Sequence, residues 1–279
     1  MTFTRTEVLA LLNNYGLAPR RAFGQNFVVD PNTVRKIARL ADVREGDFVL
    51  EIGAGLGSLT LALAETGAEI VAVEIDNGLV EVLRENTASL PNVEIIHGDA
   101  MQLDWNPLLT KSKHWHVVAN LPYNLATPII ADILDGLSQV DHLLVMVQSE
   151  VADRLVAQVG SGAYGAVSVK IDYWATAKIV GAVPATVFFP QPRVESALVD
   201  IRRRTEPGIV GVNDKDLFAL VRAGFAKRRK MLRRALADTA SAQDFITAHV
   251  NPESRAEELD LAAWGRLCKA IGSRKAGSA

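Results

Sequence analysis

The chain has 279 residues, of which 49% are hydrophobic, and a net charge of −2 at pH 7. That length and composition suffice for one large globular domain or for a large domain with a small one. The single cysteine excludes an intramolecular disulfide framework, and the first residues, MTFTRTEVLALL, lack the pattern of a secretory signal. Charges, glycines or prolines interrupt every apolar stretch, so we expect a cytoplasmic protein without a membrane span. The histidines show no metal-ligand spacing, and we expect no metal site.

Two short helices are predicted before the first strand. Thr4 and Glu7 begin one helix, which Gly16 ends, and Asp30 followed by Pro31 begins the next. The loop between them, RRAFGQNF, is basic, aromatic and amide-rich, and is therefore too polar for a core.

Apolar, β-branched runs then alternate with helical patterns. This alternation predicts a doubly wound, parallel sheet covered by helices. The predicted strands are residues 47–53, 69–76, 93–99, 116–122 and 142–148, and the predicted helices include LTLALAET, LVEVLRENT and TPIIADILDGL. After GSGAYG (residues 160–165), the runs KIDYWATAKIVGAV and SALVDIRR predict a hairpin at the sheet edge.

From about residue 205 only helical patterns follow. One predicted helix is DLFALVRAGFAKRRKMLRRAL (residues 216–236), and a capping box from Ser254 to Glu257 predicts the start of the last helix. We therefore expect a cofactor-binding catalytic domain over residues 1–205 and a small helical domain over residues 206–279.

Positive charge is concentrated in one segment of this acidic chain. Residues 202–234 contain eleven lysines or arginines and three acidic residues, a net charge of +8, which leaves −10 on the remainder. Such a segment is typical of a nucleic-acid contact, and the alternative is a solvated helix face.

The predicted first strand ends in a glycine-rich turn, EIGAGLGSLT (residues 51–60), that opens a helix. Glycines here allow positive φ and close approach of a ligand, although a purely structural turn is the alternative. Ser58 stands where a dinucleotide-binding fingerprint has its third glycine. Glu74 and Asp99 follow at the next two strand ends, where carboxylates can accept hydrogen bonds from a ribose and an adenine amino group. These features favour S-adenosylmethionine over NAD.

The segment Asn120-Leu121-Pro122-Tyr123 lies at the same predicted edge. An amino group on a nucleobase is a poor nucleophile, and acceptors must hold its N–H bonds as positive charge develops. The Asn120 side-chain oxygen and the Leu121 carbonyl are suitable acceptors, and Tyr123 can stack on the base. We therefore predict a clamp for an extruded base. The alternative is a loop-breaking proline beside a core aromatic residue.

These motifs together resemble the ribosomal RNA adenine N6-dimethyltransferase family, and within it the bacterial small-subunit (16S) type. The matching segments run in order across nearly the whole chain: FGQNF (23–27), EIGAGLG (51–57), VEID (73–76), GDA (98–100), NLPYN (120–124), FFPQPRVESALV (188–199) and FAKRRKMLRRAL (225–236). The resemblance implies a Rossmann-like class I S-adenosylmethionine-dependent methyltransferase sheet, mostly parallel with an antiparallel edge hairpin, and a small all-helical C-terminal domain. Lys227 stands where many relatives have glutamine, and Glu195 where aspartate is commoner.

The resemblance also implies an activity, a partner and site residues. The activity is dimethylation of two adjacent adenosines in a hairpin loop near the 3′ end of small-subunit (16S) rRNA, on that RNA or an immature small subunit, and we expect a monomer. The implied cofactor-binding residues are Gln25, Asn26, Val28, Gly53, Gly55, Gly57, Glu74, Asp99, Ala100 and Asn120. Asn120, Leu121, Pro122 and Tyr123 would hold the adenine, with Phe188 flanking it. The RNA-binding residues would be Arg193, Arg222, Lys227, Arg228, Arg229, Lys230 and Arg233.

Three other functions fit part of the pattern. A large-subunit rRNA adenine methylase of the resistance type shares the NLPY segment and differs in its choice of RNA. A non-catalytic RNA-binding assembly factor on the same fold would not need all the cofactor motifs. An NAD-dependent oxidoreductase is disfavoured by Ser58 and by the lack of a placed hydride-transfer acid or base.

Overall fold

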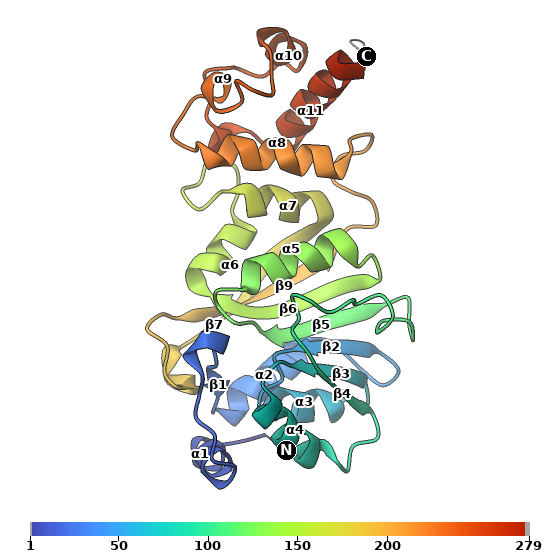
Figure 1. Cartoon of the computed structure of the whole chain (residues 1–279), viewed down its shortest axis with the longest axis vertical. Helices are drawn as coiled ribbons and strands as arrows, with labels where there is room; N and C mark the ends of the chain where they lie inside the picture. Colours follow the sequence, from blue (N-terminus) through green and yellow to red (C-terminus); the bar gives the residue numbers. More distant parts are fainter. Residues whose placement is uncertain (1, 277–279) are drawn as a thin grey trace. The chain divides into compact units, whose positions relative to one another are not determined.

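The computed structural model describes residues 2–276, and a seven-stranded sheet forms its largest element (Figure 1). The strand order is β4-β3-β2-β5-β6-β9-β7. β2, β3, β4, β5 and β6 pair in parallel, and β9 runs antiparallel to β6. The strands are β2 (Phe48–Ile52), β3 (Glu69–Glu74), β4 (Val93–His97), β5 (Trp115–Asn120), β6 (Val140–Gln148), β7 (Ala175–Val183) and β9 (Ser196–Arg203). The predicted mostly parallel sheet with an antiparallel edge is confirmed.

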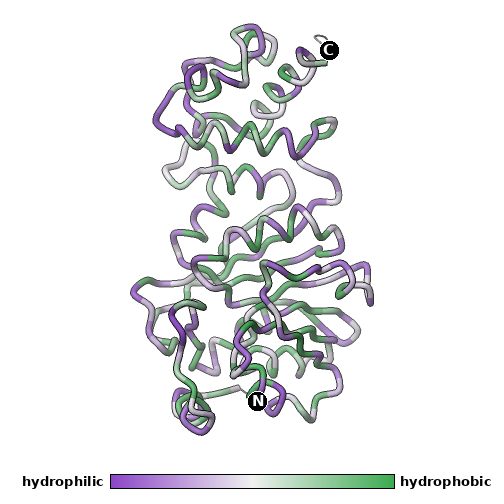
Figure 2. Tube along the Cα trace, viewed as in Figure 1, coloured by the Kyte–Doolittle hydropathy of each residue, from purple (hydrophilic) through white to green (hydrophobic). Residues whose placement is uncertain are grey.

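Strands β2, β3, β5 and β6 form because their apolar residues are buried on both faces, as a parallel sheet requires, whereas the edge strand β4 is only partly buried. Figure 2 shows hydrophobic residues concentrated along the strands and hydrophilic residues in many of the loops. One core cluster joins Val49, Val118 and Leu144 of the sheet to residues of α2 and α3. The helices of this region are α2 (Pro31–Leu40), α3 (Ser58–Ala64), α4 (Asn77–Thr87) and α5 (Ala126–Gly136).

The N-terminal helices begin where capping residues predict. In α1 (Arg5–Asn14), Thr4 and Glu7 form a capping box, and in α2 the Asp30 side chain accepts from the N–H groups of Asn32 and Thr33. A short helical turn, η1 (Arg21–Phe23), lies between them. The structure shows the expected helix starts, because a cap depends on neighbouring residues alone.

A small two-stranded sheet joins two segments that are distant in the sequence. β1 (Phe27–Val28) pairs antiparallel with β8 (Phe188–Phe189), with Phe27 opposite Phe189. A helical turn, η2 (Ala185–Val187), precedes β8. This pairing brings the FGQNF segment to the FFPQP segment.

The chain forms two compact units, and the division differs from the expected boundary at residue 205. One unit contains the residues up to Ala152 with Lys178–Arg203, and the other contains Asp153–Ala177 with the residues from Arg204 onward. Residues 153–177 belong to the helical unit because α7 (Ala166–Trp174) packs into its core, with the Tyr173 and Phe218 rings 5.2 Å apart. KIDYW, expected in a strand, ends this helix instead.

The helical unit departs from the sequence prediction at two helices. The expected helix over residues 216–236 is interrupted: α8 (Asp214–Ala226) ends before the KRRK run, and α9 (Leu232–Ala235) follows it. The last helix, α11 (Leu261–Ala276), begins after Ser254, because Asp260 and not the predicted capping box accepts from a first-turn N–H, that of Ala263. The helical elements not yet named are α6 (Ser149–Val156), α10 (Ala242–Thr247) and the turn η3 (Ala256–Glu258).

The helices contain no membrane-span candidate. Within residues 2–276, none combines the length and the apolar composition needed to cross a bilayer.

Candidate active site

The candidate site lies at the carboxyl edge of the sheet, where the strand order reverses. β2 lies between β3 and β5, and the chain proceeds through β3 and β4 on one side before it returns to β5 and β6 on the other. In open α/β sheets, this reversal leaves a crevice outside the carboxyl ends of the two strands. A pocket is present there, which we call the switch-point pocket; it is lined by residues 23–28, 53–56, 74–75 and 120–123, by Glu51, and by residues of α1, α2, α3 and α4.

The glycine turn after β2 forms one wall of the pocket. Gly53 and Gly55 have φ of +76° and +60°, which residues with a Cβ rarely adopt. A Cβ on Gly55 would lie 3.3 Å from the Phe27 ring, so the turn also approaches β1 closely. Gly57 does not line the pocket, because it is buried against Leu83 of α4. The turn is therefore shaped for a ligand at Gly53 and Gly55 and for helix packing at Gly57.

Glu74, at the end of β3, holds the glycine turn in place. The N–H of Gly55 donates to its Oε2 at 2.8 Å, and the N–H groups of Ile75 and Asp76 donate to its Oε1 at 3.0 and 2.9 Å. Burial raises the pKa of Glu74 above its ordinary value, although these backbone hydrogen bonds oppose the rise. Oε2 has the capacity to accept one more hydrogen bond, as from a ribose hydroxyl.

Glu51 is a site residue that the sequence prediction missed. It lies in β2, is 1% exposed and lines the pocket, and its Oε2 has no hydrogen-bond partner among the described residues. Burial raises the pKa of Glu51 to about 8, and the nearby carboxylate of Glu74 adds to the rise. A buried acceptor without a partner is costly, and a positively charged ligand group would relieve that cost. The available signal was an acid inside a buried strand, FVLEI.

The loop before β1 forms the opposite wall. The Asn120 side-chain Nδ2 donates to the Asn26 carbonyl at 3.0 Å, and Asn26 Nδ2 donates to the Gly24 carbonyl at 3.0 Å. A Cβ on Gly24 would lie 3.1 Å from that of Pro122, so the two segments are in close contact. Gln25 lines the pocket, but its side chain also binds Asp76, with Nε2 donating to Oδ2 at 2.9 Å. Val28 lines the pocket from β1.

The segment after β5 completes the pocket. Asn120, Leu121, Pro122 and Tyr123 all line it. The Tyr123 ring is half-buried, and its hydroxyl lies 2.8 Å from Ser196 Oγ. Burial raises the pKa of Tyr123, so the phenol remains protonated near neutral pH. The predicted gathering of the glycine turn, Glu74 and the NLPY segment in one pocket is therefore present in the structure.

Three other predicted residues lie away from the pocket wall. Asp99 and Ala100 follow β4 beside Glu74, whose carbonyl accepts from the Gly98 N–H at 3.0 Å, but neither lines the pocket. Asp99 instead accepts from the Met101 N–H and from Gln102 Nε2. Phe188, which is expected to flank the base, does not line the pocket, and its side chain is fully buried in the core cluster of the sheet.

Ile75 is a second site residue that the sequence prediction missed. It follows Glu74 directly, lines the pocket and remains 38% exposed despite its size. An exposed apolar side chain beside a ribose-type acceptor provides a surface for a flat base. The signal was an apolar residue between two acids in VEID.

The basic residues differ in their exposure and in their internal hydrogen bonds. Arg228 donates to Glu257 Oε2 at 2.6 Å and to the Gly162 carbonyl at 2.8 Å, so it holds the turn in place, while its side chain remains 42% exposed. Arg203 is also bonded internally, because its guanidinium donates to the carbonyls at the end of α5. Six of the predicted RNA-binding residues are exposed: Arg193, Arg222, Lys227, Arg229, Lys230 and Arg233.

Metal-ligating groups do not gather at this pocket or elsewhere in residues 2–276. Across that range, no group of three or more His, Cys, Asp or Glu side chains is arranged to hold an ion.

The fold is that of a Rossmann-like methyltransferase. The structure is similar to a dimethyladenosine transferase from Plasmodium falciparum, with a TM-score of 0.73 and 23% identity, over 88% of this chain and 97% of that one. It is also similar to the 23S rRNA methyltransferase ErmE, with a TM-score of 0.68 and 24% identity, over 88% and 99% of the two chains. At 23% and 24% sequence identity, these similarities show the fold alone.

Sequence comparison identifies the family. The chain matches the ribosomal RNA adenine dimethylases over residues 16–272. It is 43% identical over 278 residues to the ribosomal RNA small subunit methyltransferase A of Acidothermus cellulolyticus, covering 96% of this chain and 94% of the relative. It is 44% identical over 279 residues to the protein of that name from Cutibacterium acnes, covering 95% and 93%. The chain therefore belongs to the ribosomal RNA adenine dimethylase family.

Proposed function

We propose that this protein methylates N6 of two adjacent adenosines in a hairpin loop near the 3′ end of small-subunit (16S) rRNA. S-adenosyl-L-methionine is the proposed donor, and the products are N6,N6-dimethyladenosine and S-adenosyl-L-homocysteine. The observation that carries this proposal is that Asn120–Tyr123 and the glycine turn line one pocket. The family and the names of the two relatives support the choice of RNA.

The residues of the switch-point pocket fit the proposed donor. Glu74 would accept a ribose hydroxyl through Oε2, and Ile75 would contact the adenine. Glu51, with its unpartnered buried Oε2, would bind the ammonium group of the methionine part. Gly53 and Gly55 would leave room for this part beside the backbone, and Asn26 and Val28 would close the opposite side. Asp99 and Ala100, which follow β4 beside Glu74 and do not line the pocket itself, would contact the part of the adenine that extends past the pocket wall.

Asn120–Tyr123 would hold the target adenine. The donor supplies a methyl group on a positively charged sulfur, so no residue has to remove a proton before attack. Asn120 Nδ2 donates to Asn26, which leaves Oδ1 to accept one N6–H, and the Leu121 carbonyl would accept the other. Tyr123 would stack on the base, an interaction worth about 1–3 kcal/mol. Catalysis would come from positioning and from stabilisation of the charge that develops on N6.

The exposed basic residues would bind the RNA backbone. We propose that Arg193, Arg222, Lys227, Arg229, Lys230 and Arg233 contact phosphates, and that the helical residues after 205 take part in RNA binding. Arg228 would contribute through the exposed part of its side chain, since its guanidinium is also bonded to Glu257 and Gly162. We further propose that the protein acts as a monomer in the cytoplasm on immature small subunits.

The experiment that tests this function is methylation of immature small ribosomal subunits with labelled S-adenosylmethionine, followed by nucleoside mass spectrometry. We expect N6,N6-dimethyladenosine at two adjacent positions near the 3′ end of the RNA. Exclusive labelling of large-subunit RNA, or of another base, would contradict the proposal.

Tyr123→Ala is the matched variant for that experiment. Because Tyr123 would contact the base and not the donor, we expect a loss of methyl transfer of at least tenfold with nearly unchanged cofactor affinity. Calorimetry with S-adenosylhomocysteine measures that affinity. An equal loss of cofactor binding would place Tyr123 in the cofactor site instead.

A further inference from the structure

Tyr123 is held at the far end of its side chain by a second residue. Its phenol oxygen lies 2.8 Å from Ser196 Oγ, 73 positions further along the chain. Ser196 is the first residue of β9 and is 1% exposed. The proposed function gives no role to this buried serine, although its side chain contacts the tyrosine that would stack on the base.

The strand β6 gives this contact a fixed geometry. Ser196 lies opposite Gln148 in the ladder between β6 and β9, and the Ser149 N–H donates to the Glu195 carbonyl at 3.0 Å. The Leu121 N–H donates to the Met146 carbonyl of the same strand at 3.2 Å. Both ends of the Tyr123 side chain are thus attached to segments that β6 aligns.

We propose that Ser196 is a positioning residue that fixes the long axis of the Tyr123 ring, and that its effect falls mainly on the second of the two methyl transfers. The inference rests on the proposed function. A tyrosine attached only through Cβ can swing about χ1, whereas a tyrosine whose hydroxyl is also hydrogen-bonded has both ends of its ring axis held in place. The ring in turn sets the tilt of the base stacked on it.

The second transfer depends more on stacking because the substrate has lost a hydrogen-bond donor. In each transfer the sulfur–carbon bond breaks, a bond from that carbon to N6 forms, the sulfur keeps the electron pair, and one N6 proton passes to solvent. The unmethylated amine has two N–H groups for the Asn120 and Leu121 acceptors. After one methylation it has a single N–H, so one acceptor has no donor and the ring carries more of the positioning.

The test is a comparison of Ser196→Ala, Tyr123→Phe and the double variant with the unaltered protein, on immature small subunits. Each single variant removes one side of the same hydrogen bond. We expect the second transfer to slow by about three- to tenfold, which is the effect of one net hydrogen bond, while the first transfer changes less. N6-monomethyladenosine therefore accumulates, cofactor affinity stays unchanged, and the double variant is no worse than either single variant.

Ser168→Ala is the matched control for simple loss of stability. Ser168 is 3% exposed, and its hydroxyl donates to the Arg154 carbonyl at 2.6 Å, away from the switch-point pocket. We expect it to lower the unfolding temperature without changing the ratio of monomethyl to dimethyl product.

A product ratio in Ser196→Ala equal to that of the unaltered protein would overturn the inference, as would effects that multiply in the double variant. If Ser196→Ala does not fold, Tyr123→Phe decides the question by the same ratio. Failure of the unaltered protein to make dimethyladenosine would instead reject the proposed function.

Discussion

The side-chain amide of Asn120 donates to the backbone carbonyl of Asn26 at 3.0 Å, and so joins the end of β5 to the loop before β1. This hydrogen bond determines how the amide is turned. Nδ2 faces the loop, and Oδ1 is left to accept from a ligand. Two walls of the switch-point pocket are therefore aligned by the residue proposed to hold the target amine.

Asn120→Asp tests that alignment with almost no change of shape. A carboxylate oxygen would replace Nδ2 and repel the Asn26 carbonyl, so we expect kcat/KM for methyl transfer to fall by about 100-fold. The thermal unfolding temperature should change little, since Asn120 is only partly buried. Asn124→Asp, on an exposed side chain of the same segment, is the control and should have a much smaller effect. Wild-type activity in Asn120→Asp would refute this role.

Glu51 predicts a pH dependence of stability. Its pKa is about 8 in the folded chain, because of burial and then of Glu74, compared with 4.5 for a solvated glutamate. The folded state therefore binds more protons between these values, and stability falls as pH rises from 4.5 towards 8. In Glu51→Gln this fall should be absent, which would make the variant more stable than the wild type above pH 8 by on the order of a few kcal/mol. Urea unfolding at several pH values measures the difference.

The same residue predicts proton release on cofactor binding. At neutral pH the neutral form of Glu51 prevails, and binding of a positively charged ammonium group would favour the carboxylate. Calorimetry in buffers of different ionisation enthalpy should detect release of a fraction of a proton, and Glu51→Gln should bind more weakly without releasing it. If the wild type and Glu51→Gln released the same amount of proton, the proton would come from another group, and Glu74 is the next candidate.

The sequence predicts the sheet and the glycine turn because their determinants are local. Apolar β-branched runs mark the buried strands, and Thr4 and Asp30 mark helix starts within one turn of chain. The pairing of β1 with β8 joins residues 27 and 189, and no local pattern indicates it. Phe188 lies in this pairing opposite Val28 and is fully buried, which the sequence did not indicate either.

The basic segment shows a different limit of sequence-based prediction. Its apolar spacing suits one helix, but Lys227 to Lys230 form a turn that Arg228 fixes to Glu257. A charge count treats every arginine alike, whereas the structure uses Arg203 and Arg228 for internal hydrogen bonds. The partners of an arginine are set by tertiary contacts, which composition does not reveal.

Lys230→Glu and Lys215→Glu form a matched pair for RNA binding. Both lysines are exposed and both variants change the charge equally, but Lys230 lies in the basic turn and Lys215 in the first turn of α8. We expect Lys230→Glu to weaken binding and to reduce the slope of log affinity against log salt by about 1, since one phosphate contact is lost. Lys215→Glu should change the slope much less. If the two variants had equal slopes of log affinity against log salt, the basic turn would have only a general electrostatic role.

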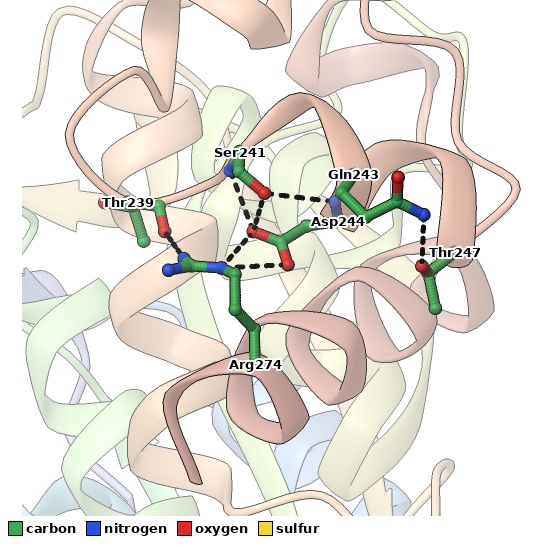
Figure 3. Close-up of polar contacts among 6 residues, drawn as sticks. All are labelled: Thr239, Ser241, Gln243, Asp244, Thr247 and Arg274. Carbon is green, nitrogen blue, oxygen red and sulfur yellow. Dashed lines mark hydrogen bonds and ion pairs between the residues drawn. The ribbon is translucent and has the colours of Figure 1, made fainter. Parts of the chain in front are cut away.

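The last prediction concerns the ion pair that attaches the end of α11 to the start of α10 (Figure 3). Arg274 Nε donates to both carboxylate oxygens of Asp244, at 3.1 and 2.9 Å, and its Nη2 donates to the Thr239 carbonyl. Asp244 is 2% exposed and also forms a capping box with Ser241. Burial alone would raise the pKa of Asp244, but the hydrogen bonds from Ser241 and Arg274 outweigh it and hold the pKa below its ordinary value.

Arg274→Ala leaves this buried carboxylate without its charged partner. We expect a loss of about 1–2 kcal/mol in the free energy of unfolding, a value reduced because the arginine is partly exposed to solvent. Because the folded pKa is depressed, the contribution of Asp244 is present above the ordinary value of 3.8 and is lost as pH falls below it. The difference between wild type and variant should therefore shrink at acid pH in urea unfolding. Arg255→Ala, at an exposed arginine of the same unit, is the control and should leave the free energy of unfolding unchanged. If the difference between wild type and Arg274→Ala were the same at every pH, packing of the Arg274 side chain, and not its charge, would provide the stability.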